Sequence, residues 1–481
     1  MSFVVTHSNY WACMRALISS LISALLLLIS NSALAITVDE GRHLLARTGF
    51  GAKPNVIAAI SQLTHSEAVD SLIAIAVAQS KKGPKTPAPS WANQSPPAWK
   101  GMSSTVRKEK RKLWRKQGHE LRAWWIEEMV MTNSPFLEHM TLFWHNHFTS
   151  SLKKVKWPPL MWQQNQLLRC NALGSFRELL HQIARDPAML IYLDGAKSRK
   201  GKPNENFARE LLELFTLGEG NYSETDIKEA ARAFTGWSVD RKTGKFKFRR
   251  KLHDAGIKRF MGQTGRFDGD DIINIILQQP RTAKHITEKL WREFVSPQPN
   301  GLRTDEIARV FHNSNYDITV LMRKLLLSPE FNSDSIRGHL TKSPLDILVG
   351  TVRTLNIPIE DYRVLALGSW RLGQDIFAPP NVKGWPGGDL WIDSAKLAER
   401  RNMLDRLLRG GKIPAGKKMG GDMQLPHPDL SPYIALAKRD GGVERLIELL
   451  LALPPVEMPD PKLYPKQRLV QLFMDPVYQV K

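Results

Sequence analysis

The chain has 481 residues, with 68 Lys and Arg against 47 Asp and Glu, for a net charge of +21. This length is sufficient for a large hydrophobic core and is usually more than one compact unit. The presence of two cysteines in the whole chain excludes a disulfide-rich scaffold. The positive charge favours acidic partners such as anionic lipid, acidic polysaccharide or a more acidic protein.

The first 35 residues have the pattern of a secretory signal peptide. Arg15 is followed by an apolar run from Ala16 to Ile29 and then by Ala33-Leu34-Ala35. Small residues at these last positions are typical of a cleavage site, although the same run could also serve as an uncleaved anchor. We therefore expect an exported protein, periplasmic or at the cell surface, and no nucleic-acid partner. Cleavage would leave Cys170 as the one remaining cysteine, so no intramolecular disulfide could form.

The hydrophobic pattern beyond this leader is mainly helical. We predict N-terminal helices over 36–79, a Pro/Ser/Lys-rich linker or loop over 80–105, a main helical domain over 106–410, and a C-terminal loop with helices over 411–481. Ser223, with Asp226 three residues later, is typical of a helix start, and Asp268 is another. One small β-hairpin is expected around 238–250. The predicted fold class is thus mainly α, a multi-helix array with one hairpin.

Two segments concentrate the positive charge. They are "VRKEKRKLWRK" (106–116) and "RKTGKFKFRRK" (241–251). Dense charge runs usually form solvated faces, and we expect both to do so.

The segment "TLFWHNHFTS" (141–150) places two histidines near the end of an amphipathic helix. Residues two apart on a helix point about 200° apart, so the two imidazoles should not share a metal. We expect His147 on the buried Met140 face, as a core histidine or a ligand. His145 should face outward with Glu138, which makes it the better candidate for a reactive base.

The helix predicted over 204–217 has one apolar and one polar face. Its polar residues are Glu205, Asn206, Arg209, Glu210 and Glu213. They could form surface ion pairs of Arg209 with Glu205 and Glu213 at i,i+4, or line a pocket between helices. Because Glu210-x-x-Glu213 lacks the histidine of ferritin-like di-iron sites, that metal class is disfavoured.

Two loops complete the candidate segments. His253-Asp254 enters a turn after the hairpin, followed by Lys258, and is either an Asp-centred turn or part of a site. The loop 377–394 contains prolines, glycines and Trp385, and could wall a pocket or staple helices together. No P-loop, Rossmann fingerprint, Gly-x-Ser-x-Gly, His-Glu-x-x-His or Cys-x-x-Cys motif occurs.

Six segments together resemble a family of exported bacterial proteins catalogued as domain of unknown function 1800. They are "LLARTGFG" (44–51), "EHMTLFWHNHF" (138–148), "NENFARELLELFTLGEGNYSETDIKEAARAFTGW" (204–237), "HDAGIKRFMG" (253–262), "LWREFV" (290–295) and "PPNVKGWPGGDLWI" (379–392). The resemblance implies export and, as a possible partner, a co-encoded secreted protein of alkaline-phosphatase-like fold. It implies no established activity. Its motif positions are His145, His147, Asn204, Glu205, Asn206, Arg209, Glu210, Glu213, Asp226, His253, Asp254, Lys258 and Trp385.

Charged groups beside aromatic runs must pair with one another, which favours one shared polar pocket. In a catalytic version, His145 or His253 is the base, and Glu210 or Asp254 orients it. Glu205, Asn206, Arg209, Lys258 and Trp385 would then bind an anionic envelope component. A divalent metal, if there is one, would be held by His145, His147, Glu210, His253 and Asp254. An envelope hydrolase and a non-catalytic scaffold with a structural polar core are the alternatives.

Overall fold

Helices dominate the described part of the chain. The computed structural model describes residues 34–97, 102–414 and 421–481. The predicted signal peptide therefore lies outside the described residues, apart from Leu34 and Ala35. Within these ranges, no helix is both long and apolar enough to cross a bilayer. The mainly α fold class is confirmed.

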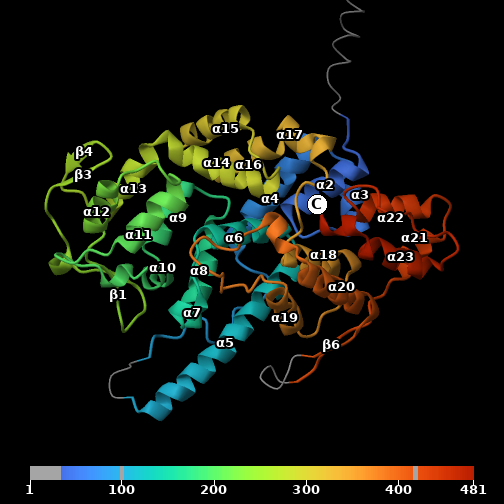
Figure 1. Ribbon diagram of the computed structural model, residues 1–481, viewed down its shortest axis with the longest axis horizontal. Helices are drawn as coiled ribbons and strands as arrows, with labels where there is room; N and C mark the ends of the chain where they lie inside the picture. Colours follow the sequence, from blue (N-terminus) through green and yellow to red (C-terminus); the bar gives the residue numbers. More distant parts are fainter. Residues whose placement is uncertain (1–33, 98–101, 415–420) are drawn as a thin grey trace, which may run out of the picture.

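The elements follow the chain from one end of the molecule and back (Figure 1). The first part contains α2 (Val38–Thr48), α3 (Pro54–Ile60), α4 (His65–Lys82), α5 (Ser104–Met131), α6 (Pro135–His147), α7 (Leu152–Val155), α8 (Pro158–Asn171), α9 (Phe176–Ala184), α10 (Pro187–Tyr192) and the short helix η1 (Gly195–Lys197). The middle contains α11 (Glu205–Glu210), η2 (Leu211–Thr216), α12 (Glu224–Ala233), β1 (Trp237–Val239), β2 (Phe246–Phe248), η3 (Arg250–Leu252), β3 (Lys258–Phe260) and β4 (Gln263–Gly265).

Helices then resume as α13 (Gly269–Gln278), α14 (Pro280–Phe294), α15 (Gly301–Asn313), α16 (Ile318–Leu326), α17 (Pro329–Asn332), η4 (Asp334–Ile336), α18 (Pro344–Leu355), α19 (Arg363–Arg371), η5 (Gly388–Trp391) and α20 (Ser394–Arg409). The last part contains β5 (Gly411–Ile413), β6 (Met423–Leu425), α21 (Ser431–Ala437), α22 (Gly442–Leu450), α23 (Pro465–Met474) and η7 (Pro476–Gln479). Helix α2 packs against α22, so the two ends of the described chain meet (Figure 1).

Helix starts are set by local capping chemistry. The Ser223 hydroxyl accepts the N–H of Asp226, whose carboxylate accepts the N–H of Ser223 in return. The same reciprocal capping box opens α13 at Asp268. Both starts were predicted, because each box satisfies two backbone donors that a helix end leaves unpaired.

The strands pair only locally. β1 and β2 form the predicted antiparallel hairpin, with Trp237 opposite Phe248. Two further hairpins, β3–β4 and β5–β6, occur in the described residues and were not predicted. Each has strands of three residues, too short for a clear alternation of apolar and polar side chains.

Residues 83–97 run along α5 instead of projecting into solvent. The Glu128 carboxylate on α5 accepts the backbone N–H groups of Lys85 at 3.0 Å and Thr86 at 2.6 Å. The indole N–H of Trp91 donates to Glu120 at 2.7 Å, and Trp91 is buried. The segment is thus tied to α5 along its length.

One apolar cluster runs through the molecule from Ile36 to Tyr478. Helix α6 lies inside it, in contact with α2, α4, α5 and α8. Because neighbouring helices cover α6 on several sides, its polar side chains are buried as well as its apolar ones.

Candidate functional site

His145 and His147 on α6 are both buried, so the predicted outward orientation of His145 is wrong. The exposed fraction of His145 is 1% and that of Glu138 is 0%. Glu138 does not orient His145, because its two carboxylate oxygens accept hydrogen bonds from Arg169 and from the Trp125 indole. The face of α6 that helical periodicity assigned to solvent is covered by α5 and α8.

His145 lies in an aromatic cage. Its ring centroid is 5.2 Å from Trp125, 5.2 Å from Phe377 and 5.8 Å from Trp385. Neither ring nitrogen has a hydrogen-bond partner among the described residues. Burial lowers the pKa of His145 to about 3, so the imidazole is neutral at physiological pH.

His147 caps a turn of π-helix. Helix α11 continues into η2, where the wider i→i+5 turn leaves carbonyl groups unpaired. The Nε2–H of His147 donates to the carbonyl of Phe215 at 3.1 Å. His285 and Lys289 on α14 donate to the carbonyl of Leu214, each at 3.1 Å. Sequence reasoning missed both α14 residues, because the π turn that needs them has no sequence signature.

The polar face of α11 forms ion pairs with α12. Arg209 makes two hydrogen bonds to Glu224, at 2.8 and 2.9 Å, and one of 3.3 Å to Glu205. The predicted pairing of Arg209 with Glu213 does not occur in the described structure; Glu213 instead accepts from Tyr222 at 2.9 Å. The π turn separates Arg209 from Glu213 and so breaks the i,i+4 relation on which that pair depended.

The other two candidates on α11 differ in burial. Glu210 is half-buried, and burial, together with the neighbouring Glu213 carboxylate, raises its pKa. The positive charge of Lys383 from the 377–394 loop opposes this shift. The side chain of Asn206 is exposed.

The His253-Asp254 turn is attached to α12. The ring of His253 lies 2.9 Å from the carbonyl of Thr235, and Arg232 donates to the Asp254 carboxylate at 2.9 Å. The hydrogen bond from Arg232 holds the pKa of Asp254 near about 2. The Lys258 ammonium donates to the carbonyl of Asp254 at 2.6 Å. This network stabilises the turn.

The structure brings some of the candidates together and separates others. Asn146, between the two histidines, accepts the backbone N–H of Trp385 at 2.8 Å, which joins α6 to the 377–394 loop. The described contacts of the His253-Asp254 turn are not with His145 or Glu210. No group of three or more His, Cys, Asp or Glu in the described ranges could hold a metal ion. The motif residues thus form several separate networks, each satisfying polar groups between helices.

A different feature collects the positive charge. A groove of about 1780 Å³ lies between the N-terminal half of α5, α7, η1 and the β1–β2 hairpin. Its cationic lining residues are Arg107, Arg111, Arg115, Arg122, Lys153, Lys156, Lys197, Arg199, Arg241, Lys242 and Arg249, and among the described lining residues Asp240 is the one carboxylate. We call it the cationic groove. It joins the two dense runs, 106–116 and 241–251, that were expected to be separate solvated faces.

Few of these charges are neutralised locally. Arg122 pairs with Asp375 and Lys197 with Asp194. Asp240 is itself occupied by Lys247, at 2.9 Å. In the described structure, eight cationic groups of the groove have no carboxylate within 4.0 Å. They are the ammonium groups of Lys153, Lys156 and Lys242 and the guanidinium groups of Arg111, Arg115, Arg199, Arg241 and Arg249. The groove therefore presents unpaired positive charge.

The tip of the β1–β2 hairpin closes one side of the groove. Gly244 has φ +73°, and a Cβ there would lie 2.9 Å from the Trp157 ring at the start of α8. Trp157 and Trp237 are both buried in the walls, the latter under the guanidinium of Arg185. These tryptophans shape the walls of the groove.

Comparisons with known proteins give one match. No curated protein and no solved structure matches the chain. A family model described as a protein of unknown function, DUF1800, matches residues 43–472. The match covers most of the chain, including α6, the π turn and both walls of the cationic groove. The chain therefore belongs to the DUF1800 family.

Proposed function

We propose that this protein is exported and binds an anionic polymer of the cell envelope in the cationic groove. The observation that carries the proposal is the charge of the groove, where many Lys and Arg side chains face one carboxylate. Like charges brought together in a concave surface raise the local concentration of an oppositely charged ligand. Such an arrangement costs folding stability, which a bound polyanion would restore.

The shape of the site favours a linear polymer over a membrane surface. The charges line a groove with walls from α5 and the β1–β2 hairpin, and a planar bilayer cannot enter such a groove. The faces of Trp157 and Trp237 are covered, so they offer no platform on which nucleobases could stack. An acidic polysaccharide, recognised through its carboxylates, is the class that fits best.

The motif residues support this function as a scaffold. His147, Lys289 and His285 pair the carbonyls of the π turn, and Arg232 holds the Asp254 turn on α12. These contacts pair polar groups and fix how the helices dock, which is a structural role. This use of the motif residues favours a binding protein over a metal-dependent or acid–base hydrolase.

Direct binding tests the proposal. Purified mature protein is titrated with polygalacturonate, neutral dextran and single-stranded DNA at several salt concentrations. Polygalacturonate should bind, with affinity that falls steeply as salt rises from about 50 to 200 mM, as for polyanions in general. Dextran should not bind. Preferred binding of the DNA would identify a different class of ligand and contradict the glycan proposal.

Charge-matched variants test the location. Lys153→Gln, Lys156→Gln and Lys242→Gln together should weaken polygalacturonate binding by about tenfold or more. The control combines Lys81→Gln, Lys324→Gln and Lys438→Gln, three exposed lysines outside the groove with the same total change in charge. Equal losses in both triple variants would show that net charge, and not the groove, determines binding.

Export is tested separately. N-terminal sequencing of the protein recovered from the producing cell should begin at Ile36, since cleavage is expected after Ala35. Recovery in the cytoplasmic fraction with an intact N-terminus would contradict the envelope location.

A further inference from the structure

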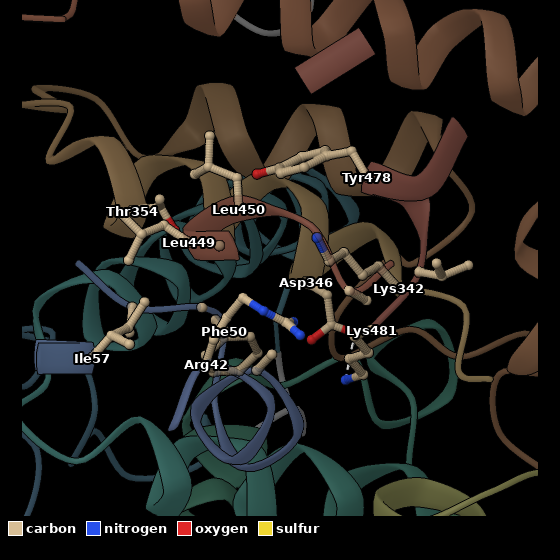
Figure 2. Close-up of a pocket in the computed structure, with 16 residues that line it drawn as sticks. Arg42, Phe50, Ile57, Lys342, Asp346, Thr354, Leu449, Leu450, Tyr478 and Lys481 are labelled. Atoms are coloured by element: carbon tan, nitrogen blue, oxygen red, sulfur yellow. Dashed lines mark hydrogen bonds and ion pairs between the residues drawn. The ribbon is translucent and has the colours of Figure 1, made fainter. Parts of the chain in front are cut away.

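A small cavity with charged walls lies between the N-terminal and C-terminal parts of the described chain (Figure 2). Its volume is about 40 Å³, and its walls include Arg42 and Phe50 near α2, Asp346 on α18, and Tyr478 and Lys481. It shares no lining residue with the cationic groove. Figure 2 shows Arg42 and Lys481 beside the Asp346 carboxylate, whereas the Lys342 side chain extends toward Tyr478.

Most charges in the wall have a partner, and Lys342 does not. Lys481 forms an ion pair of 2.9 Å with Asp346, and Arg42 pairs with Asp39. The Lys342 ammonium lies 3.9 Å from the centroid of the Tyr478 ring. In the described residues, no carboxylate lies within 4.0 Å of this ammonium and no oxygen accepts its N–H groups.

The electrostatic surroundings of Lys342 are positive. Its interactions with Arg42, Lys481 and Arg400 are repulsive, and only the interaction with Asp346 is attractive. Burial, reinforced by these cations, lowers the pKa of Lys342 to about 7. The Lys342 side chain is partly exposed. An ammonium that solvent hydrates only in part, and that no carboxylate neutralises, either loses its proton or takes up a counter-ion.

Two further polar atoms in the wall lack partners. The Nε–H of Arg42, a residue with 6% of its surface exposed, has no acceptor in the described structure. One oxygen of Asp346 also has no donor. A cavity of this volume exceeds the roughly 10–15 Å³ that one water needs, so a water and a small ion both fit.

We propose that this cavity binds a small inorganic anion, chloride in a chloride-containing medium, held by the Lys342 ammonium and the Arg42 guanidinium. Water alone would satisfy hydrogen bonds but leave the excess positive charge in place. The negative charge of Asp346 does not exclude the anion, because Lys481 neutralises it directly. A monomer unit of a polymer is too large for a cavity of this volume.

Thermal unfolding tests the proposal. Mature protein is unfolded at pH 6 and pH 9 in sodium chloride and in sodium gluconate of equal ionic strength. At pH 6, chloride should raise Tm by about 2 °C in a saturable manner. The rise should shrink at pH 9, because the Lys342 ammonium that holds the anion loses its proton as pH rises. Equal Tm values in the two salts at pH 6 would overturn the proposal.

A variant pair and a diffraction measurement locate the ion. Lys342→Met should abolish the chloride effect, and Lys324→Met, at an exposed lysine outside the cavity, should preserve it. Crystals soaked in sodium bromide should show an anomalous peak beside the Lys342 ammonium. A cavity that holds only water in bromide overturns the proposal, and this result remains decisive if Lys342→Met fails to fold.

Discussion

The Lys289 ammonium donates a hydrogen bond to Nδ1 of His147 at 3.2 Å, and the Nε2–H of the same imidazole donates to the carbonyl of Phe215. Both nitrogens of His147 are therefore engaged, and the ring is neutral. Burial lowers the pKa of His147, and the nearby Lys289 charge lowers it further. A nitrogen that already accepts from an ammonium cannot bind a metal, so His147 acts as a cap for the π turn.

Substitution of this imidazole should destabilise the fold. His147→Phe leaves the Phe215 carbonyl without a donor and the Lys289 ammonium without one of its acceptors. The expected loss is about 2–4 kcal/mol of unfolding free energy, measured from the urea midpoint. His427→Phe, at an exposed histidine, is the control and should change the midpoint little. An unchanged midpoint for His147→Phe would show that the cap has no structural role.

Buried neutral histidines should make the protein sensitive to acid. Burial lowers the pKa values of His145 and His285 to about 3 each. In the unfolded chain, histidine titrates near 6.5, so below that pH the unfolded state binds protons that the folded state does not. Their stabilising contribution is complete above about pH 6.5 and falls toward pH 3. At pH 5 the loss is about 2 kcal/mol for each imidazole.

His145→Leu isolates one of these imidazoles. Because neither ring nitrogen of His145 has a partner, an apolar side chain should be tolerated, with a change within about 1 kcal/mol at pH 7.5. Between pH 7.5 and pH 5, the unfolding free energy of the variant should fall by about 2 kcal/mol less than that of the wild-type protein. Urea unfolding at both pH values checks this, with His427→Leu as the control. A variant that keeps the full acid sensitivity would contradict the assignment.

Local signals in the sequence predicted helix starts well. The Ser223–Asp226 box and the helix start at Asp268 occur as expected, because a cap depends on residues within one turn. The β1–β2 hairpin was also predicted from local alternation. By contrast, the π turn at 211–216 inserts an extra residue into a regular helical pattern, and no local signal marks it.

Long-range relations could not be predicted from one sequence. Helical periodicity gave α6 an exposed face, but α5 and α8 cover that face in the fold. The basic runs 106–116 and 241–251 are far apart in the chain. A run of this composition can form either a solvated face or the wall of a groove, so composition alone does not distinguish the two. Only their positions in the fold show that they face one another.

The contact between α6 and the 377–394 loop requires a glycine at position 384. Gly384 has φ +86°, and a Cβ there would lie 2.2 Å from the Asn146 side-chain oxygen and 2.8 Å from its carbonyl oxygen. Gly384→Ala should therefore cost more than about 2 kcal/mol, since the clash adds to the backbone strain. The urea midpoint checks this loss.

The substitution Gly387→Ala distinguishes the cost of backbone strain from the cost of the steric clash with Asn146. Gly387 also has positive φ, +69°, but a Cβ there would meet no atom within 4 Å. Its substitution should cost only the strain, about 1 kcal/mol. Equal losses at the two positions would show that the Asn146 contact does not require glycine.

The ion pair between Arg169 and Glu138 links α8 to α6 in the interior, where both side chains have no exposed surface. Arg169→Met leaves the Glu138 carboxylate buried with only the Trp125 indole as donor, so it should cost about 3–5 kcal/mol. Glu138→Gln combined with Arg169→Met removes both charges, while the amide oxygen can still accept from Trp125. The double variant should therefore be more stable than Arg169→Met alone. A double-mutant cycle from urea unfolding measures this coupling, and additive losses would show that the two charges do not depend on each other.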